Sequence, residues 1–177
     1  MLVTIGIASC DGGSEDPTQT PTHPPPETRH PEPGAAIARD DEHGAEEAAR
    51  YFWSLYSYAY ATGDLDEWRD LSHPECATCQ TVVDRVTELH DAGGHAEGGM
   101  IRLDVIEATP PGEGDLYFNV HVEGTQEPLT HIGEGGDTLA ESSGTEMNAD
   151  MALARDADGW LVREVANNNE EQGEADG

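Results

Sequence analysis

The hydrophobic period of this chain changes once, after Gly94, and that change constrains the fold more than any other feature. Residues 42–62 carry apolar side chains at the three- and four-residue spacing of one helix face. They are Ala45, Ala48, Ala49, Phe52, Leu55, Tyr56 and Ala59. Beyond Gly94 the spacing becomes two, which is typical of strands with one buried face. Such strands are expected at 101–106, 116–123, 147–154 and 160–165. Helices followed by strands of this kind predict an α+β fold, with helices covering one face of an antiparallel sheet.

Capping residues predict where three helices begin and end. Asp41 is expected to cap the first helix, and Gly63 to end it. Two capping boxes, at 64–67 and 72–75, predict the starts of a short second helix and of a third helix. The third helix is expected to run to about Asp91, before a glycine pair.

Composition divides the chain into a folded domain at 41–166 and flanking segments. Residues 11–40 hold seven of the eleven prolines together with acidic residues, so we expect a disordered, extended linker. Residues 167–177 are polar and acidic and predict a disordered tail. Within the domain, 129–132 predict a short edge strand, and 134–144 predict a flexible acidic loop.

The first ten residues contain a motif that bears on location. Residues 7–10, Ile-Ala-Ser-Cys, resemble the bacterial lipobox, in which the cysteine is lipidated and becomes the first residue of the mature protein. Residues 1–9 lack a basic start and are too short to span a bilayer, so we interpret 1–10 as a truncated lipoprotein signal. A lipidated Cys10 would attach the domain to a membrane. The alternative is an accidental match in an ordinary terminus.

The charge of the chain is strongly acidic. Eight basic residues oppose 37 acidic residues, for a formal net charge of −29. Such a field repels phosphate backbones and anionic lipids, which excludes nucleic acid and limits any membrane contact to a lipid anchor. One hypothesis is adaptation to a saline medium, because at about 1 M salt the Debye length falls to about 3 Å. The alternative is acidic tails on an ordinary domain.

The three cysteines are consistent with one lipidated cysteine and one disulfide-forming pair. Cys76 and Cys79 lie three residues apart near the start of the third predicted helix, where their Cα atoms would be about 5 Å apart. If Cys10 is lipidated and the chain is exported, the remaining pair is expected to form a disulfide. Two alternatives stay open, a redox dithiol and a zinc site that uses His73, His90 and both thiolates.

Two stretches carry a family resemblance, AARYFWSLYSYAYATGDLDEWRDLSHPECATC and DGWLVREV. Their order, with an aromatic first helix and a closing strand, resembles the nuclear-transport-factor-2-like (SnoaL-like) cone fold. The longer stretch is similar to an uncharacterised actinobacterial family of secreted, lipobox-bearing proteins. The resemblance implies three N-terminal helices packed on a curved, cone-like antiparallel sheet of about four strands, and an extracytoplasmic location. It implies no activity.

Aromatic residues on the first helix predict a pocket. Trp53, Tyr56 and Tyr60 fall on one flank of the apolar face, and Trp68 is expected to join them. Together these side chains could line a site for an apolar or ring-bearing ligand. The alternative is that they belong to the core and rim of a small domain.

Other candidate side chains are expected outside the pocket. Tyr51 and Tyr58 fall on the opposite side of the first helix, where they would meet solvent or a second copy of the chain in a homodimer. Asp104, His121 and Asp150 are acid–base candidates on strands. Their phase is opposite to that of the apolar residues, which predicts exposure to solvent.

Two hypotheses of function follow from these patterns. The first is a membrane-anchored extracytoplasmic lipoprotein whose domain binds a small ligand or a protein partner. The second is a tethered cone-fold enzyme, of isomerase, dehydratase or hydrolase type, that uses an acid or base in the pocket. The sequence shows no serine–histidine–acid motif, glycine-rich phosphate loop or paired metal-ligand motif, so no cofactor or metal is expected.

Overall fold

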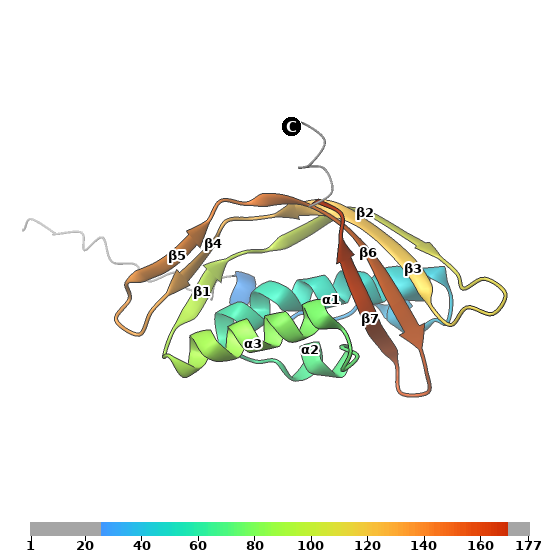
Figure 1. The fold of residues 1–177 in the computed structure, drawn as a ribbon, viewed down its shortest axis with the longest axis horizontal. Helices are drawn as coiled ribbons and strands as arrows, with labels where there is room; N and C mark the ends of the chain where they lie inside the picture. Colours follow the sequence, from blue (N-terminus) through green and yellow to red (C-terminus); the bar gives the residue numbers. More distant parts are fainter. Residues whose placement is uncertain (1–25, 170–177) are drawn as a thin grey trace, which may run out of the picture.

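Three α-helices lie on the concave side of an arch of strands in the computed structural model, which describes residues 26–169 (Figure 1). The helices are α1 (Glu42–Thr62), α2 (Asp66–Asp70) and α3 (Ala77–Asp91), preceded by two 3₁₀ turns, η1 (Pro26–Thr28) and η2 (Ala35–Ala38). The strands are β1 (His95–Gly98), β2 (Ile101–Thr109), β3 (Phe118–Gln126), β4 (Leu129–Ile132), β5 (Thr138–Ser142), β6 (Thr145–Arg155) and β7 (Trp160–Asn167). The predicted α+β class, with helices before strands, is confirmed.

The strands form two antiparallel sheets rather than one. The larger sheet has the order β2-β3-β6-β7, which corresponds to the four strands predicted from the alternation. The smaller sheet has the order β1-β4-β5. Of its strands only β4 was expected. The predicted flexible loop at 134–144 is therefore wrong in part, because residues 138–142 pair with β4 along their length. All five residues of β5 are exposed, so the sequence of β5 has no buried face that would give an alternation of apolar and polar residues.

The two sheets meet at short breaks in the chain, where a strand of one sheet continues into a strand of the other. β1 and β2, β3 and β4, and β5 and β6 are each separated by two residues. Gly98 and Gly99 adopt φ values of 78° and 73°, a left-handed conformation that other residues rarely adopt. There the Gly99 amide donates to the Pro128 carbonyl (2.8 Å), and the Glu127 amide donates to that of Met100 (2.9 Å). These breaks lie where the strands bend over the helices (Figure 1).

Helix α1 begins and ends where its caps predict. The Asp41 carboxylate accepts a hydrogen bond from the Gly44 amide (3.3 Å), and Gly63 ends the helix with φ 76°. The apolar stripe of α1 packs against the inner face of the sheets. That face is formed by alternate buried residues of β3, β6 and β7, among them Val120, Val122, Met151, Leu153 and Val162.

The capping box expected for α3 is wrong, and the one expected for α2 forms only in part. Helix α3 begins at Ala77, with Cys76 as its cap, so residues 72–75 lie before it. The Ser72 hydroxyl donates to the Trp68 carbonyl (2.6 Å), at the end of α2 rather than at the start of α3. The His73 amide donates to the Val162 carbonyl (2.9 Å), which holds this segment along β7. At the other box, the Asp64 carboxylate accepts a hydrogen bond from the Asp66 amide (3.2 Å) at the start of α2. The Asp64 amide donates to the Thr62 hydroxyl rather than to Glu67, so the reciprocal bond of the box is absent.

Residues 26–40, here called the strap, pack on the domain. The expectation of a disordered linker is therefore wrong for these residues. Four hydrogen bonds attach the strap: Trp160 Nε1 to the Ile37 carbonyl (2.9 Å), the Gly34 amide to Glu47 (2.7 Å), the Gly98 amide to Glu27 (3.1 Å) and Arg155 Nε to Asp40 (2.9 Å). Prolines lose little conformational entropy on ordering, so they suit a packed strap as well as a free linker. Residues 11–25, Cys10 and the tail beyond Asn169 lie outside the described residues.

The strap covers the face of α1 that was expected to meet solvent or a second chain. Tyr51 is only 6% exposed. Tyr58 is partly buried, and its ring packs edge-on against the ring of His30, with centroids 5.1 Å apart. Both tyrosines therefore belong to the packing of a single chain. None of the helices in residues 26–169 is long and apolar enough to cross a membrane.

Candidate functional site

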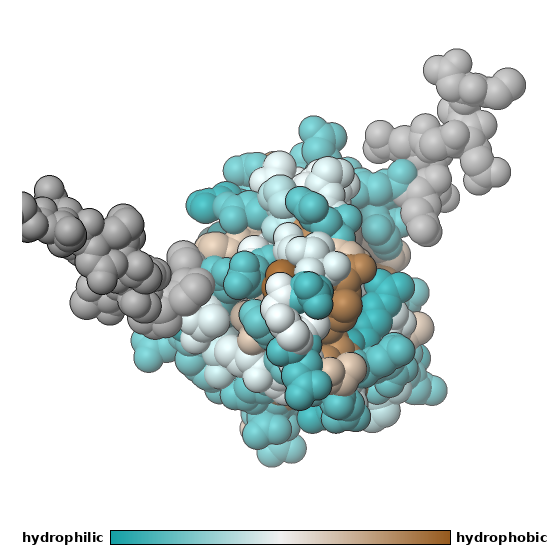
Figure 2. Space-filling model, turned by 90° about the vertical axis from the view of Figure 1, so that its left-hand side faces the viewer, coloured by the Kyte–Doolittle hydropathy of each residue, from teal (hydrophilic) through white to brown (hydrophobic). Residues whose placement is uncertain are grey.

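A cleft opens between the helices and the concave side of the arch, close to the bend. One cavity of about 320 Å³ is lined by α1, α3, β6 and β7, and a second of about 340 Å³ extends beneath β4 and β5. The two cavities share four lining residues, Tyr56, Tyr60, Arg85 and Gln126. We call the joined space the aromatic cleft. The end of the molecule that carries β1, β4 and β5 is mostly hydrophilic, with a small hydrophobic area near its centre (Figure 2).

Three of the four predicted pocket residues line the aromatic cleft. Trp53 is largely buried, and its indole N–H points to the sulfur of Met151 (3.2 Å). The rings of Tyr56 and Tyr60 lie against each other, with centroids 4.8 Å apart. Tyr60 is only 2% exposed and stacks on His131 of β4 at 5.7 Å. The structure thus brings these three residues together on one side of the cleft.

Trp68, the fourth predicted residue, lies in the core instead. It is 1% exposed and stacks on Phe52, with ring centroids 4.0 Å apart. Its indole N–H donates to the carbonyl of Cys79 (3.1 Å), which fixes α2 against the start of α3. The separate helix α2 turns this side chain away from the cleft, and Trp68 is not among the residues that line it.

Arg85 and Gln126 line both cavities, and the sequence analysis did not select either of them. Arg85 follows the inward-facing Val82 by three residues on α3, and this spacing was the only signal available. Within residues 26–169, Arg85 forms no ion pair. Burial raises the pKa of the Tyr60 hydroxyl, contact with Tyr56 raises it further, and the Arg85 guanidinium acts in the opposite direction. These three polar residues thus line the same part of the cleft, with Arg85 at its exposed side.

The acid–base candidates on strands lie on the outer face of the larger sheet, away from the cleft. His121 and Asp150 face each other across β3 and β6, with Nδ1 and Oδ1 2.9 Å apart. The hydrogen bond to Asp150 raises the pKa of His121. Hydrogen bonds from Asn168 and then from His121 lower the pKa of Asp150. Both side chains remain partly exposed, at 35% and 44%, and Asp104 is also exposed.

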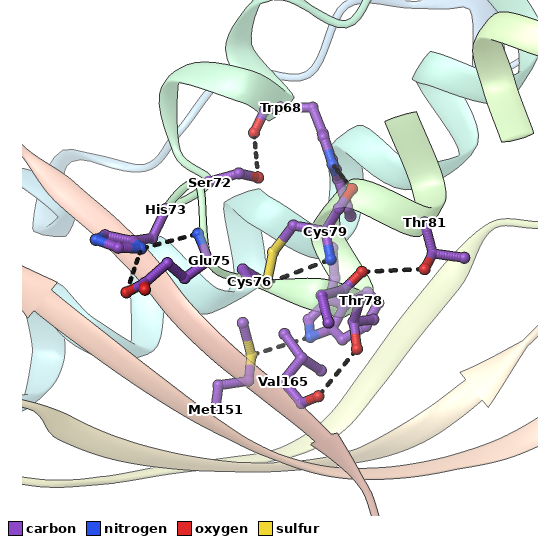
Figure 3. The surroundings of a disulfide bond; sticks show 12 residues. Trp68, Ser72, His73, Glu75, Cys76, Thr78, Cys79, Thr81, Met151 and Val165 are labelled. Carbon is purple, nitrogen blue, oxygen red and sulfur yellow. Dashed lines mark hydrogen bonds and ion pairs between the residues drawn. A yellow bond between two sulfur atoms is a disulfide. The ribbon is translucent and has the colours of Figure 1, made fainter. Parts of the chain in front are cut away.

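Cys76 and Cys79 form a disulfide at the start of α3, with Cα atoms 5.2 Å apart (Figure 3). Both cysteines are buried, and the Cys76 sulfur accepts a hydrogen bond from the Cys79 amide (3.3 Å). Next to them the Thr78 hydroxyl donates to the Val165 carbonyl (3.1 Å), which ties the same turn to β7. The pair therefore caps α3 and anchors the corner between α2 and α3.

The histidines of the zinc alternative have other partners. His73 Nδ1 accepts a hydrogen bond from the Glu75 amide (3.1 Å), as Figure 3 shows. His90 Nε2 donates to the carbonyl of Tyr60 (3.0 Å). In residues 26–169, no three histidine, cysteine or carboxylate side chains are placed to hold a metal ion.

A second hollow lies between the strap and α1, and the sequence analysis missed it because it treated the strap as a linker. This groove, called the strap groove, has a volume of about 510 Å³. Its walls include Arg29 and His30 of the strap, Ser57 and Tyr58 of α1, and Met100 at the bend. It lies along the side of α1 that carries Ser54 and Tyr58, shares only Ile101 with the aromatic cleft, and provides an internal comparison for that cleft.

The architecture belongs to a class of α+β domains in which helices occupy the concave side of antiparallel sheets. Residues 18–166 match the family described as "Family of unknown function (DUF6318)", and the chain belongs to that family. No curated protein sequence matches the chain.

Among solved structures, the chain is similar to the intermembrane space region of the chloroplast protein ARC6. The TM-score is 0.55 at 12% identity, and the match covers 73% of this chain and 97% of that one. A structure from Catenulispora acidiphila matches with a TM-score of 0.46 at 15% identity, covering 74% of this chain and 96% of that one. At such identities the first likeness concerns the fold alone.

Proposed function

We propose that this chain is an extracytoplasmic, lipid-anchored binding module whose domain takes up a small ring-bearing molecule in the aromatic cleft. The observation that carries the proposal is the cleft itself, a cavity with an aromatic wall on α1 and polar side chains on its other sides. Its two parts, of about 320 and 340 Å³, each fall within the range of known small-molecule sites, about 300–1,000 Å³.

The walls of the aromatic cleft suit a planar, apolar ligand. Trp53 and Tyr56 offer aromatic surface, and Val82, Met147 and Ala149 add aliphatic surface on the other sides. Aromatic walls favour ring-bearing molecules through stacked and edge-on contacts. Polar side chains from several elements, among them Thr81, Arg85 and Gln126, line the rest of the cleft. Such groups fix the orientation of a bound ligand.

Binding is better supported than catalysis by the same residues. No carboxylate or histidine in residues 26–169 is buried. Glu146 and Glu141 line the cleft from β6 and β5, and both are exposed. A general acid or base tuned for catalysis at neutral pH usually owes its shifted pKa to burial or close charges. Among the histidines and carboxylates that line the cleft, only His131 is half-buried, so the enzyme alternative would rest on that residue.

The finer fold and the location belong to the same proposal. The strands arch over the helices, which supports the cone-like, nuclear-transport-factor-2-like arrangement implied by the sequence resemblance (Figure 1). The disulfide between Cys76 and Cys79 supports an oxidising compartment outside the cytosol. The lipobox-like motif before Cys10 supplies the membrane attachment. The net charge of −29 leaves small molecules or proteins as partners, rather than nucleic acid or anionic lipid surfaces.

The binding proposal is tested by filling each hollow separately. Planar aromatic compounds are screened by thermal shift against the wild type, where a ligand at 100 times its Kd adds about 2.7 kcal/mol of stability. Met147→Trp fills the aromatic cleft, and Met100→Trp, the matched control, fills the strap groove. We expect Met147→Trp to abolish the shift and Met100→Trp to preserve it. The reverse pattern, or no ligand at all, would overturn the proposal.

The location is tested by lipid labelling. Cells that express the chain with its natural upstream sequence are fed a labelled fatty acid and fractionated. We expect label on the wild-type chain in the membrane fraction and none on Cys10→Ala. Intact mass of the membrane-derived protein should also show the loss of two hydrogens at Cys76 and Cys79. An unlabelled, reduced chain in the cytosol would contradict this part of the proposal.

A further inference from the structure

We infer that the ligand of the aromatic cleft carries a carboxylate, and that Arg85 with Tyr56, Tyr60 and Gln126 receives it. The inference rests on the proposed function and specifies its ligand class. It begins from an unusual arginine in a very acidic chain. All eight basic residues are arginines and all are described, and five of them pair with carboxylates.

Arg85 remains without such a partner although acids are nearby. Glu141 and Glu146 line the same cleft, yet neither carboxylate lies within ion-pair distance of Arg85. Two other arginines in residues 26–169 also lack an ion pair: Arg29 lines the strap groove, and Arg69 is exposed on α2. Arg85 is thus the one arginine that places an unpaired guanidinium in the aromatic cleft.

Neutral polar side chains line both cavities beside Arg85. They include Tyr56 and Tyr60, whose rings lie against each other, and burial raises the pKa of the Tyr60 hydroxyl, which therefore stays protonated and can donate. The side-chain amide of Gln126 lines both cavities and makes no hydrogen bond within residues 26–169. A guanidinium fork beside phenol and amide donors matches the planar, two-oxygen geometry of a carboxylate.

The arrangement also sets the orientation of the ligand. Arg85 is exposed and lies at the mouth of the cleft, whereas Trp53 and Ala149 are buried deeper in its wall. The ring of the ligand therefore points inward, and the carboxylate stays at the mouth. Glu141 and Glu146 repel negative charge elsewhere along the opening. The cleft thus favours a molecule with one anionic group over a polyanion.

Matched acids and amides test the inference. The probes are benzoate and benzamide, indole-3-acetate and indole-3-acetamide, and 2-naphthoate and 2-naphthamide, titrated to millimolar concentration and followed by amide chemical shifts of the labelled domain. We expect at least one acid to bind about tenfold more tightly than its amide, the factor of a charge-assisted hydrogen bond. Arg85→Gln should reduce the affinity for the acid to that of the amide. Arg85→Lys keeps the charge without the fork and should give an intermediate affinity.

Arg69→Gln is the control, because it removes the same charge from an exposed position on α2 and should leave the affinity unchanged. The inference is overturned if Arg85→Gln binds the acid as tightly as the wild type, or if the amides bind as well as the acids. In both cases the cleft still binds ring compounds, and the proposed function stands. If neither acids nor amides shift residues of the cleft, the inference and the proposed function both fail.

Discussion

Replacing Gly44 by alanine tests the packing of the strap, because local and tertiary effects on stability have opposite signs. Gly44 lies in the first turn of α1, where alanine normally stabilises a helix by about 1 kcal/mol relative to glycine. Here a Cβ at residue 44 would lie 2.2 Å from the backbone carbonyl oxygen of Arg39 and 2.9 Å from Cζ2 of Trp160. The strap would have to move away from α1.

The size of the effect follows from these contacts. Overpacking in a buried site costs about 1–3 kcal/mol, and the upper value applies because the closest atom belongs to the backbone. Subtracting the gain in helix propensity leaves a net loss of about 2 kcal/mol in the free energy of unfolding. For a domain of this size that loss lowers the Tm by about 4–8 °C.

Denaturant and thermal unfolding, followed by circular dichroism, measure the effect of Gly44→Ala in two chains. The first is the full chain. The second begins at Asp40, so it keeps the Asp41 cap but lacks the Arg39 carbonyl. There Gly44→Ala should lose most of its penalty. A Gly44→Ala variant of the longer chain that is as stable as the wild type, or more stable, would show that residues 26–40 do not pack as described.

Three further predictions concern the disulfide, the outer histidine and the net charge. Cys76→Ser combined with Cys79→Ala should reduce the free energy of unfolding by about 2 kcal/mol, the chain-entropy value for so short a loop, and an unchanged denaturation midpoint would refute this. The raised pKa of His121 means that its stabilising contact with Asp150 is complete below the unfolded-state pKa of about 6.5. This contribution is lost as the pH rises through the higher folded-state pKa. From about pH 6 to about pH 8 the free energy of unfolding should therefore fall more for the wild type than for His121→Gln, and parallel plots of stability against pH would refute the contact. The net charge of −29 predicts a Tm that rises from dilute buffer to about 1 M sodium chloride, and an unchanged Tm would refute salt adaptation.

The elements in which apolar residues recur at a regular helical or strand spacing were predictable from the sequence. Helix α1 has its predicted bounds, because its apolar face and both caps are local signals. The strands of the larger sheet were predictable because one face is buried and the other is not. β5 gives no such signal, since both of its faces are exposed and only backbone pairing with β4 defines it.

The strap shows where composition misleads. Its prolines and acidic residues resemble a linker, yet its place is decided by contacts with distant residues. The Trp160 side chain, 123 positions away, donates to the Ile37 carbonyl. Nothing local in the sequence encodes such a bond. The same reason explains why Tyr58 was expected to meet solvent or a second copy of the chain, whereas it packs against His30 of the strap.

The candidate site was half predictable. Helix phase placed Trp53, Tyr56 and Tyr60 on one wall of the cleft. Arg85 and Gln126 line that cleft from α3 and β3, and apart from the three-residue spacing between Val82 and Arg85 no local signal marks them. Trp68 was misplaced because the turn between α1 and α2 redirects it toward Phe52 and Cys79.

A crystal structure of the domain soaked with the tightest-binding aromatic acid tests the central claim most directly. The account predicts the ring between Trp53 and Met147, with the carboxylate within hydrogen-bonding distance of the Arg85 guanidinium. Ligand density confined to the strap groove, or to the outer face around His121, would contradict it.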